Sequence, residues 1–249
     1  MNHPSNSFQW DSSAITHVGK VRKINEDACF DRPDAGLWVV ADGMGGHSSG
    51  DLASSTIVTT LERLLLPDLL SDTVDLLEDS LQAINRQLLD EAIRRGGDTT
   101  IGSTVVALLA YETVCLLLWV GDSRAYRFRD GQLKQLTRDH TEVEELVEQG
   151  LLLRDDVENH PSANIITRAV GAMDELIVDL LDYAILEGDI FLLCSDGLNK
   201  EVTDREIAAM LSRPESMREI NQALIDLTLS RGARDNVSVV LARAEKRIT

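Results

Sequence analysis

Several aspartates in this sequence lie at the ends of apolar runs, beside a glycine or another small residue. They are Asp42, Asp122, Asp196 and Asp235. A short apolar run predicts a buried strand, so a carboxylate at its end is expected to be only partly solvated. Carboxylates gathered in such a place repel one another and take up protons, and bound cations remove that penalty. Oxygen ligands without a His or Cys cluster favour Mg²⁺ or Mn²⁺ over Zn²⁺.

Each of these segments has a simpler explanation when it is taken alone. Asp-Gly pairs are common turn residues, and for any single pair a turn is the better interpretation. The recurrence of the arrangement along the chain favours the cation site. The glycine-rich segment 43–46 lacks the lysine, serine and spacing of a nucleotide-binding loop. We expect it to form a tight turn that brings backbone close to a metal.

A further charged segment, residues 16–27, places Arg22 ahead of Glu26 and Asp27. The planar guanidinium of arginine suits bidentate recognition of a phosphate. Read alone, Arg22 is better explained as a surface charge or as an ion-pair partner of Glu26. The sequence around it therefore leaves its role open.

The elements that must position these residues come in blocks of strands and helices. Strands are predicted at residues 36–41, 103–110, 114–120, 125–128, 133–136, 177–184, 190–194 and 237–242. Helices are predicted at residues 51–66, 74–95, 140–153, 204–211 and 216–230, with a polar loop at 154–164. The short steps between the strands from 103 to 136 predict an antiparallel meander. Because the predicted strands and helices come in blocks and do not alternate strictly, they favour one α+β domain of largely antiparallel sheets covered by helices.

The composition argues against several classes of protein. The chain has 249 residues, a formal net charge of −18 and a pI near 4.6, so neither nucleic acid nor an anionic membrane is expected as a main partner. Its apolar runs fall short of the ~20 residues that span a bilayer, and residues 1–10 lack the pattern of a signal peptide. Cys29, Cys115 and Cys194 show no CxxC spacing, which predicts reduced thiols and a cytoplasmic location.

Taken in order, these motifs resemble the PPM-type (protein phosphatase 2C-like) metal-dependent Ser/Thr phosphatases, especially the bacterial branch. The matching stretches are residues 19–27, 40–47, 102–106, 120–124, 166–171, 193–197 and 235–238. The resemblance implies a four-layer α-β-β-α sandwich of two antiparallel sheets flanked by helices. It also implies that residues 1–249 form a single domain, with a flap subdomain at about 138–169 beside the cleft.

The resemblance also implies a set of metal ligands. Asp42 would bridge two core Mg²⁺ or Mn²⁺ ions, with the backbone carbonyl of Gly43 completing the shell of the first. Asp196 and Asp235 would hold the second ion. Asp27 and Glu26 would belong to the acidic shell around these ions, and Asp122 would bind a third, more weakly held ion together with Asp196. Asn236 would support the ligands, and Arg22 would bind the substrate phosphate.

One position departs from the eukaryotic relatives, which have a histidine directly after the Asp-Gly pair as the proposed general acid. Met44 stands there in this sequence, and His47 follows three residues later, as in bacterial members. Two interpretations of His47 stay open: a general acid near the leaving group, or a cap on the following helix. His140 and His160 fall in the flap and are interpreted as solvated loop residues.

The function implied is hydrolysis of phosphoserine and phosphothreonine by a water activated at a dinuclear Mg²⁺ or Mn²⁺ centre. The implied partners are phosphorylated proteins, among them a Ser/Thr kinase that the enzyme opposes, and the chain is expected to be a monomer. No covalent nucleophile is required, and the chain lacks the CxxxxxR loop of cysteine phosphatases. The alternatives are a catalytically silent phosphopeptide- or partner-binding module and a small-molecule phosphomonoesterase.

Overall fold

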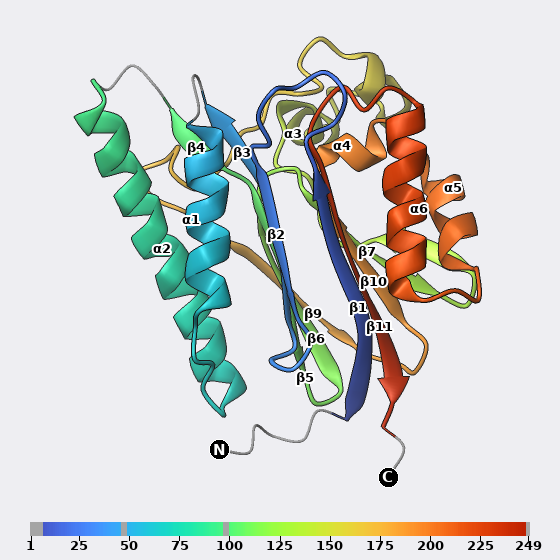
Figure 1. Cartoon of the computed structure of the whole chain (residues 1–249). Coiled ribbons are helices and arrows are strands. Elements are labelled where there is room, and N and C mark those ends of the chain that lie inside the picture. The colour runs from blue at the N-terminus through green and yellow to red at the C-terminus, as the bar shows by residue number, and fades with distance from the viewer. Residues whose placement is uncertain (1–6, 46–48, 97–99, 248–249) are drawn as a thin grey trace.

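The computed structural model describes residues 7–45, 49–96 and 100–247. Within them, two antiparallel sheets lie face to face and helices cover the outer face of each sheet (Figure 1). The four-layer fold expected from the sequence is therefore confirmed.

The first sheet has the strand order β1-β11-β10-β7-β8. Its strands are β1 (Phe8–His17), β7 (Arg124–Arg129), β8 (Gln132–Gln135), β10 (Ile190–Cys194) and β11 (Val237–Lys246). Strand β1 pairs with β11 along its whole length, from Phe8 opposite Lys246 to His17 opposite Val237. This pairing brings the segment that follows β1 next to the segment that precedes β11.

The second sheet has the order β2-β3-β5-β6-β9, with β4 paired to the end of β3. Its strands are β2 (Asp27–Arg32), β3 (Leu37–Gly45), β4 (Ile101–Ser103), β5 (Val105–Tyr111), β6 (Val114–Val120) and β9 (Asp179–Ala184). Strand β3 continues through Gly43 to Gly45, where it pairs with β4. The predicted tight turn in this part of the 43–46 segment is thus wrong, because the glycines extend a strand.

Helices lie on both outer faces of the sandwich (Figure 1). They are α1 (Gly50–Glu62), α2 (Leu70–Arg94), α3 (Glu142–Glu148), α4 (Asp196–Asn199), α5 (Asp204–Leu211), α6 (Met217–Ser230) and the 3-10 helix η1 (Arg154–Asn159). Helices α1 and α2 pack on the second sheet, and α4, α5 and α6 pack on the first. None of the described helices is long and apolar enough to cross a membrane.

Alternating side chains of the central strands build the three apolar layers. In β3, Leu37 and Val39 face α1 and α2, whereas Trp38 and Val40 face the opposite sheet. Because both faces of such a strand are covered, it is continuously apolar. The end of such a strand is a rigid and poorly solvated place for a carboxylate.

The predicted meander from 103 to 136 is wrong at one step. Strands β5 and β6 pair with each other, and so do β7 and β8, but β6 and β7 belong to different sheets. Gly121 makes the crossing with a φ of +103°, a conformation that L side chains rarely adopt. The crossing leaves Asp122 between the two sheets instead of on a hairpin.

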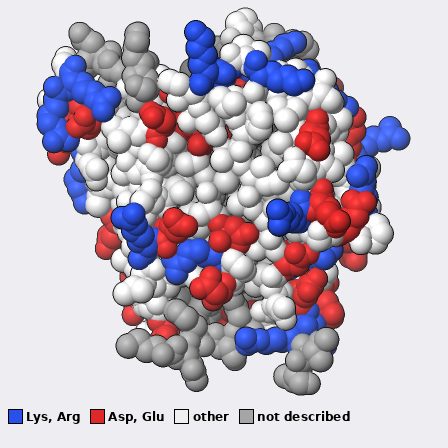
Figure 2. Space-filling model, in the orientation of Figure 1, with Lys and Arg blue, Asp and Glu red and all other residues white. Residues whose placement is uncertain are grey.

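Other elements differ from the prediction mainly at their boundaries. The helix expected at 140–153 is only α3, and the polar loop at 154–164 contains η1. Strands β1 and β2 and the short helix α4 were not predicted. On the face in Figure 2, acidic and basic side chains alternate in small groups around a wide area of uncharged residues, so the excess acidic charge is spread on this face.

Candidate active site

The elements that carry the predicted aspartates meet at one end of the sandwich (Figure 1). Asp27 is the first residue of β2 and lies directly opposite Asp42 of β3 in the strand register. Asp196 begins α4 immediately after β10, and Asp235 precedes β11. Asp122 follows β6. The pKa of Asp42 responds to all four of the others, which places them within one electrostatic cluster.

Asp27 is buried, and hydroxyl groups from the opposite sheet hold one of its oxygens. Its Oδ2 accepts hydrogen bonds from Ser195 Oγ at 2.7 Å and from Ser238 Oγ at 2.8 Å. Its Oδ1 has no hydrogen-bond partner. Burial raises the pKa of Asp27 to about 7, although the two hydroxyl donors oppose the shift. One oxygen of this carboxyl group is therefore anchored and the other is free to bind.

Asp42 is held through its backbone. Its N–H donates to Thr104 Oγ1 at 3.1 Å, and its carbonyl oxygen accepts from Ser103 Oγ and from the Thr104 N–H at 2.9 Å each. Burial, followed by Asp27 and Asp196, raises the pKa of Asp42 well above its ordinary value. The side-chain carboxyl is the part of Asp42 left to interact with a ligand.

Gly43 allows a close backbone approach next to Asp42. A Cβ at this position would lie 2.0 Å from the carbonyl oxygen of Gly50 and 2.5 Å from that of Glu26. The Gly43 N–H donates to the same Glu26 carbonyl at 3.0 Å. Only glycine lets the start of α1 and the end of the β1–β2 loop meet here.

Asp122 and Asp196 line a cleft of about 800 Å³ together with Arg22, Asp235 and Lys200. Burial and then Asp196 raise the pKa of Asp122 to about 7. Oδ2 of Asp196 accepts a hydrogen bond from Lys200, which lies one helical turn later. Oδ1 of Asp196 has no hydrogen-bond partner. Burial disfavours the charged form of Lys200, but Asp196 outweighs it and the pKa of Lys200 is raised.

Arg22 lies at the rim of this cleft with half of its side chain exposed. Its Nη2 donates to Asp235 Oδ2 at 2.8 Å. The ion pair with Glu26 considered in the sequence analysis is not formed, since Glu26 Oε1 instead accepts from the Gly50 N–H at 3.2 Å. Arg22 is therefore oriented towards the aspartate cluster.

Asn236 fixes the loop that carries Arg22. Its Nδ2 donates to the carbonyl oxygens of Val18 and Ile24 at 2.9 and 3.0 Å, and its Oδ1 accepts from the Glu26 N–H at 2.8 Å. Each polar atom of the buried amide is thus used to hold the loop from 18 to 26. The supporting position at the site implied for Asn236 stays a prediction.

The histidines have different outcomes. His47 lies outside the described residues. The prediction that His140 is solvated is wrong. Its side chain is only 7% exposed, because it packs against Trp119 at the base of the flap. Burial lowers the pKa of His140. His160 lies in the outer flap, where its Nδ1 accepts from the Ser162 N–H at 3.2 Å.

The donor set fits a hard divalent cation. Asp27 Oδ1 and Asp196 Oδ1 are buried carboxylate oxygens without a hydrogen-bond partner, which is costly unless a cation binds them. Among the described residues, no three Asp, Glu, His or Cys side chains stand in a geometry that could hold a metal ion without adjustment. Arg22 and Lys200 are the basic groups that contact the cluster, through Asp235 and Asp196.

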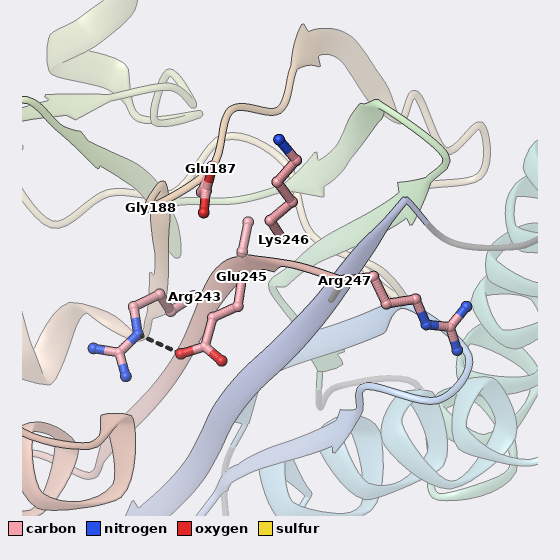
Figure 3. Close-up of a pocket in the computed structure, with 7 residues that line it drawn as sticks. Glu187, Gly188, Arg243, Glu245, Lys246 and Arg247 are labelled. Carbon is pink, nitrogen blue, oxygen red and sulfur yellow. Dashed lines mark ion pairs between the residues drawn. The ribbon is translucent and has the colours of Figure 1, made fainter. Parts of the chain in front are cut away.

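A second hollow, of about 560 Å³, lies at the other end of β11 and contains none of the predicted site residues. Arg243 and Glu245 pair across it at 3.3 Å, and Arg247 points away from them (Figure 3). It therefore has no part in the aspartate cluster.

Sequence reasoning assigned no role to Ser195, Ser238 or Lys200. Ser195 stands directly before Asp196 and Ser238 lies in the 235–238 motif, so both were within quoted stretches. Only the packing of the first sheet against the second, which carries Asp27, reveals that both hydroxyls bind this residue. Lys200 could have been found from its i+4 spacing to Asp196, which allows an ion pair on one helix.

Residues 17–236 match the family model described as protein phosphatase 2C. This chain belongs to the protein phosphatase 2C family. It is 34% identical over 238 residues to the serine/threonine phosphatase stp of Listeria welshimeri, covering 91% of this chain and 92% of that protein. Such relatives confirm the expected family and the expected enzyme class, a serine/threonine protein phosphatase.

Solved structures of the family have the same fold. PppA of Pseudomonas aeruginosa, described as a key regulatory component of T6SS, is 45% identical with a TM-score of 0.87, over 94% of this chain and 97% of that one. The catalytic domain of the phosphatase PstP, solved with two manganese ions, is 33% identical with a TM-score of 0.82, over 96% of this chain and 99% of that one.

Proposed function

We propose that this chain removes phosphate from phosphoserine and phosphothreonine in proteins by direct attack of water at a dinuclear metal centre. The observation that carries the proposal is the cluster of buried carboxylates, with free oxygens on Asp27 and Asp196, beside the exposed guanidinium of Arg22. Carboxylates that raise one another's pKa are typical of sites built to hold cations or to move protons.

Mg²⁺ or Mn²⁺ is the cofactor that fits this donor set. Asp42 with the Gly43 carbonyl, Asp196 and Asp235 would hold two core ions, with Asp27 and Glu26 beside them. Asp122 and Asp196 would hold a third. The two manganese ions of the relative PstP support a dinuclear core. When bound, such ions activate an attacking water and neutralise charge on the phosphoryl oxygens.

Arg22 is the residue proposed to bind the substrate phosphate. Its Nη2 donates to Asp235, and its side chain is half exposed at the rim of the cleft, so a phosphate can reach its remaining N–H groups. The fork of the guanidinium binds two phosphate oxygens and fixes the orientation of the ester. Asn236 supports this role because it holds the Arg22 loop against β11.

The flap at about 138–169 is proposed to form one wall of the substrate cleft within a single domain. Thr141, Val157, Ala163 and Asn164 of this segment line the cleft together with Lys200 and Arg234. The role of His47 as general acid stays a prediction.

The proposed biological setting is the cytoplasm of a bacterium, where the enzyme opposes a Ser/Thr kinase. The description of the relative PppA as a regulatory component supports a regulatory setting.

Phosphate release from phosphothreonine and phosphoserine peptides, a panel of phosphorylated metabolites and p-nitrophenyl phosphate, all with Mn²⁺, tests the substrate class. We expect the peptides to give the highest kcat/KM. A metabolite that outcompetes every peptide would indicate a small-molecule phosphomonoesterase. Peptide binding by calorimetry without turnover at saturating Mn²⁺ would indicate a silent binding module.

A further inference from the structure

His140 contacts the turn that carries Asp122 in two places. Its backbone N–H donates to the carbonyl oxygen of Gly121 at 2.9 Å, and its side-chain Nδ1 accepts from the Gly121 N–H at 3.0 Å. Main chain and side chain of one residue therefore hold both polar groups of the residue before Asp122. Because Nδ1 accepts, the imidazole carries its proton on Nε2.

Gly121 depends on such contacts for its position. It has no side chain, its φ is +103°, and a Cβ there would lie 2.6 Å from Thr104 Cγ2. Glycine in this conformation has the greatest backbone freedom to lose. The two bonds to His140 restrict the freedom of the turn just before the Asp122 carboxylate.

The same histidine joins the two ends of the flap. Its carbonyl oxygen accepts from the Thr167 N–H at 2.8 Å, and the next residue, Thr141, forms a bridge with Ile166. Its Nε2 lies 3.3 Å from Asp179 Oδ2, and Asp179 Oδ1 accepts from Arg168 at 3.0 Å. The imidazole lies nearly parallel to Trp119 of β6, with an interplanar angle of 17°. The flap base and the Asp122 turn are thus linked through one buried side chain.

We propose that His140 is a positioning residue that holds Gly121 through Nδ1, directs the Asp122 carboxylate into the cleft, and couples that carboxylate to the flap base. The functional consequence rests on the proposed phosphatase activity, but the coupling itself is a property of the fold. If His140 only filled space, its function would not require a hydrogen-bond acceptor at the δ position of the ring.

The chain allows a test that separates the δ acceptor from size and burial. In His140→Asn, the amide oxygen can take the place of Nδ1, whereas His140→Gln moves the polar atoms one bond further out. His160→Gln is the matched control, because His160 lies in the same flap and its Nδ1 accepts from the nearby Ser162 N–H instead of from Gly121. Asp122→Asn identifies the Mn²⁺ binding that depends on Asp122.

Two quantities are measured in each variant, hydrogen exchange of the Gly121 amide and Mn²⁺ binding by titration. Turnover of a phosphothreonine peptide is measured for the wild-type chain. His140→Gln is expected to speed exchange at Gly121 about tenfold and to weaken Asp122-dependent Mn²⁺ binding similarly, as for a lost buried hydrogen bond. His140→Asn is expected to restore most of both, and His160→Gln to change neither.

The proposal is overturned if His140→Asn and His140→Gln behave alike, or if Gly121 exchange is unchanged in folded His140→Gln. Should His140→Gln not fold, loss of Gly121 protection in His140→Asn alone overturns it. A wild-type chain that turns over no phosphopeptide contradicts the proposed function instead, and the Gly121 exchange still decides the role of His140.

Discussion

Asp27, the first residue of β2, lies directly opposite Asp42 of β3, beside strand residues that pack in the apolar layers. Two carboxylates in this register repel each other, and after burial Asp27 is the largest cause of the raised pKa of Asp42. This arrangement lowers the stability of the protein without a cation and supplies the ligands that bind one. Functional sites commonly lower the stability of the folded protein in this way.

The first prediction concerns the stability of chelated protein. In folded protein the pKa of Asp27 rises from 3.8 to about 7, so the folded state binds more protons than the unfolded chain across this interval. Stability therefore falls as pH rises from 3.8 towards 7. Asp27→Asn removes this loss and should raise the unfolding midpoint at pH ~8 by about 3 °C or more.

At pH ~2.5, below both pKa values of Asp27, the carboxyl is protonated in the folded and the unfolded state, so Asp27→Asn and wild type should unfold at similar temperatures. Thermal unfolding in chelator at both pH values is the measurement. A variant that is less stable than wild type at the higher pH would contradict the conclusion that the buried, ionised Asp27 destabilises the protein without a cation.

The second prediction concerns Arg22. Arg22→Lys keeps the positive charge but loses the fork, so KM for a phosphopeptide should rise about tenfold. Arg22→Ala should raise KM further, with Mn²⁺ affinity retained or increased because Asp235 loses its ion-pair partner. Steady-state kinetics and metal titration measure the two effects. An unchanged KM in both variants would remove Arg22 from phosphate binding.

The third prediction concerns Lys200, which competes with a metal for Asp196. Lys200→Met removes one positive charge from contact with the carboxylate cluster, so Mn²⁺ should bind severalfold more tightly. Lys134→Met on β8 is the matched control, because Lys134 is exposed and has no place in the cleft. Weaker Mn²⁺ binding in Lys200→Met would indicate that the lysine supports the ligands instead of competing with the metal.

The fourth prediction concerns the free thiols. Burial raises the pKa of Cys29 and of Cys115 to about 12 and that of Cys194 higher still, so all stay protonated at neutral pH. Since the thiolate is the reactive form, a thiol reagent at pH ~8 should label the native protein slowly and the unfolded protein at all three cysteines. Fast labelling of native protein with loss of activity would instead indicate a catalytic cysteine.

Local patterns predicted much of the fold and the site. An apolar strand that ends in Asp-Gly is a property of neighbouring residues, so Asp42 and Asp196 could be found without a structure. Strand β1 could not, because Asp11, Ser12 and Ser13 interrupt its apolar pattern and its stability comes from pairing with β11. The crossing at Gly121 depends on which sheet accepts β7, which short sequence spacing does not encode.

His140 shows the same limit at the level of one side chain. Its place among polar residues predicts a solvated side chain, yet His140 is buried by contacts with Trp119 and Gly121, about twenty residues earlier. Such long-range contacts override local polarity. The hydroxyls of Ser195 and Ser238 are a similar case, because their common partner Asp27 is remote in sequence.

The most direct test of the central claim compares phosphate release from a phosphothreonine peptide by wild type and by Asp196→Asn, each with Mn²⁺ and after chelation. Asp75→Asn, an exposed position on α2, is the control. We predict that wild type and Asp75→Asn are active only with Mn²⁺, and that Asp196→Asn loses at least about a hundredfold in kcat/KM. Full activity that survives both chelation and Asp196→Asn would contradict a metal centre built on these aspartates.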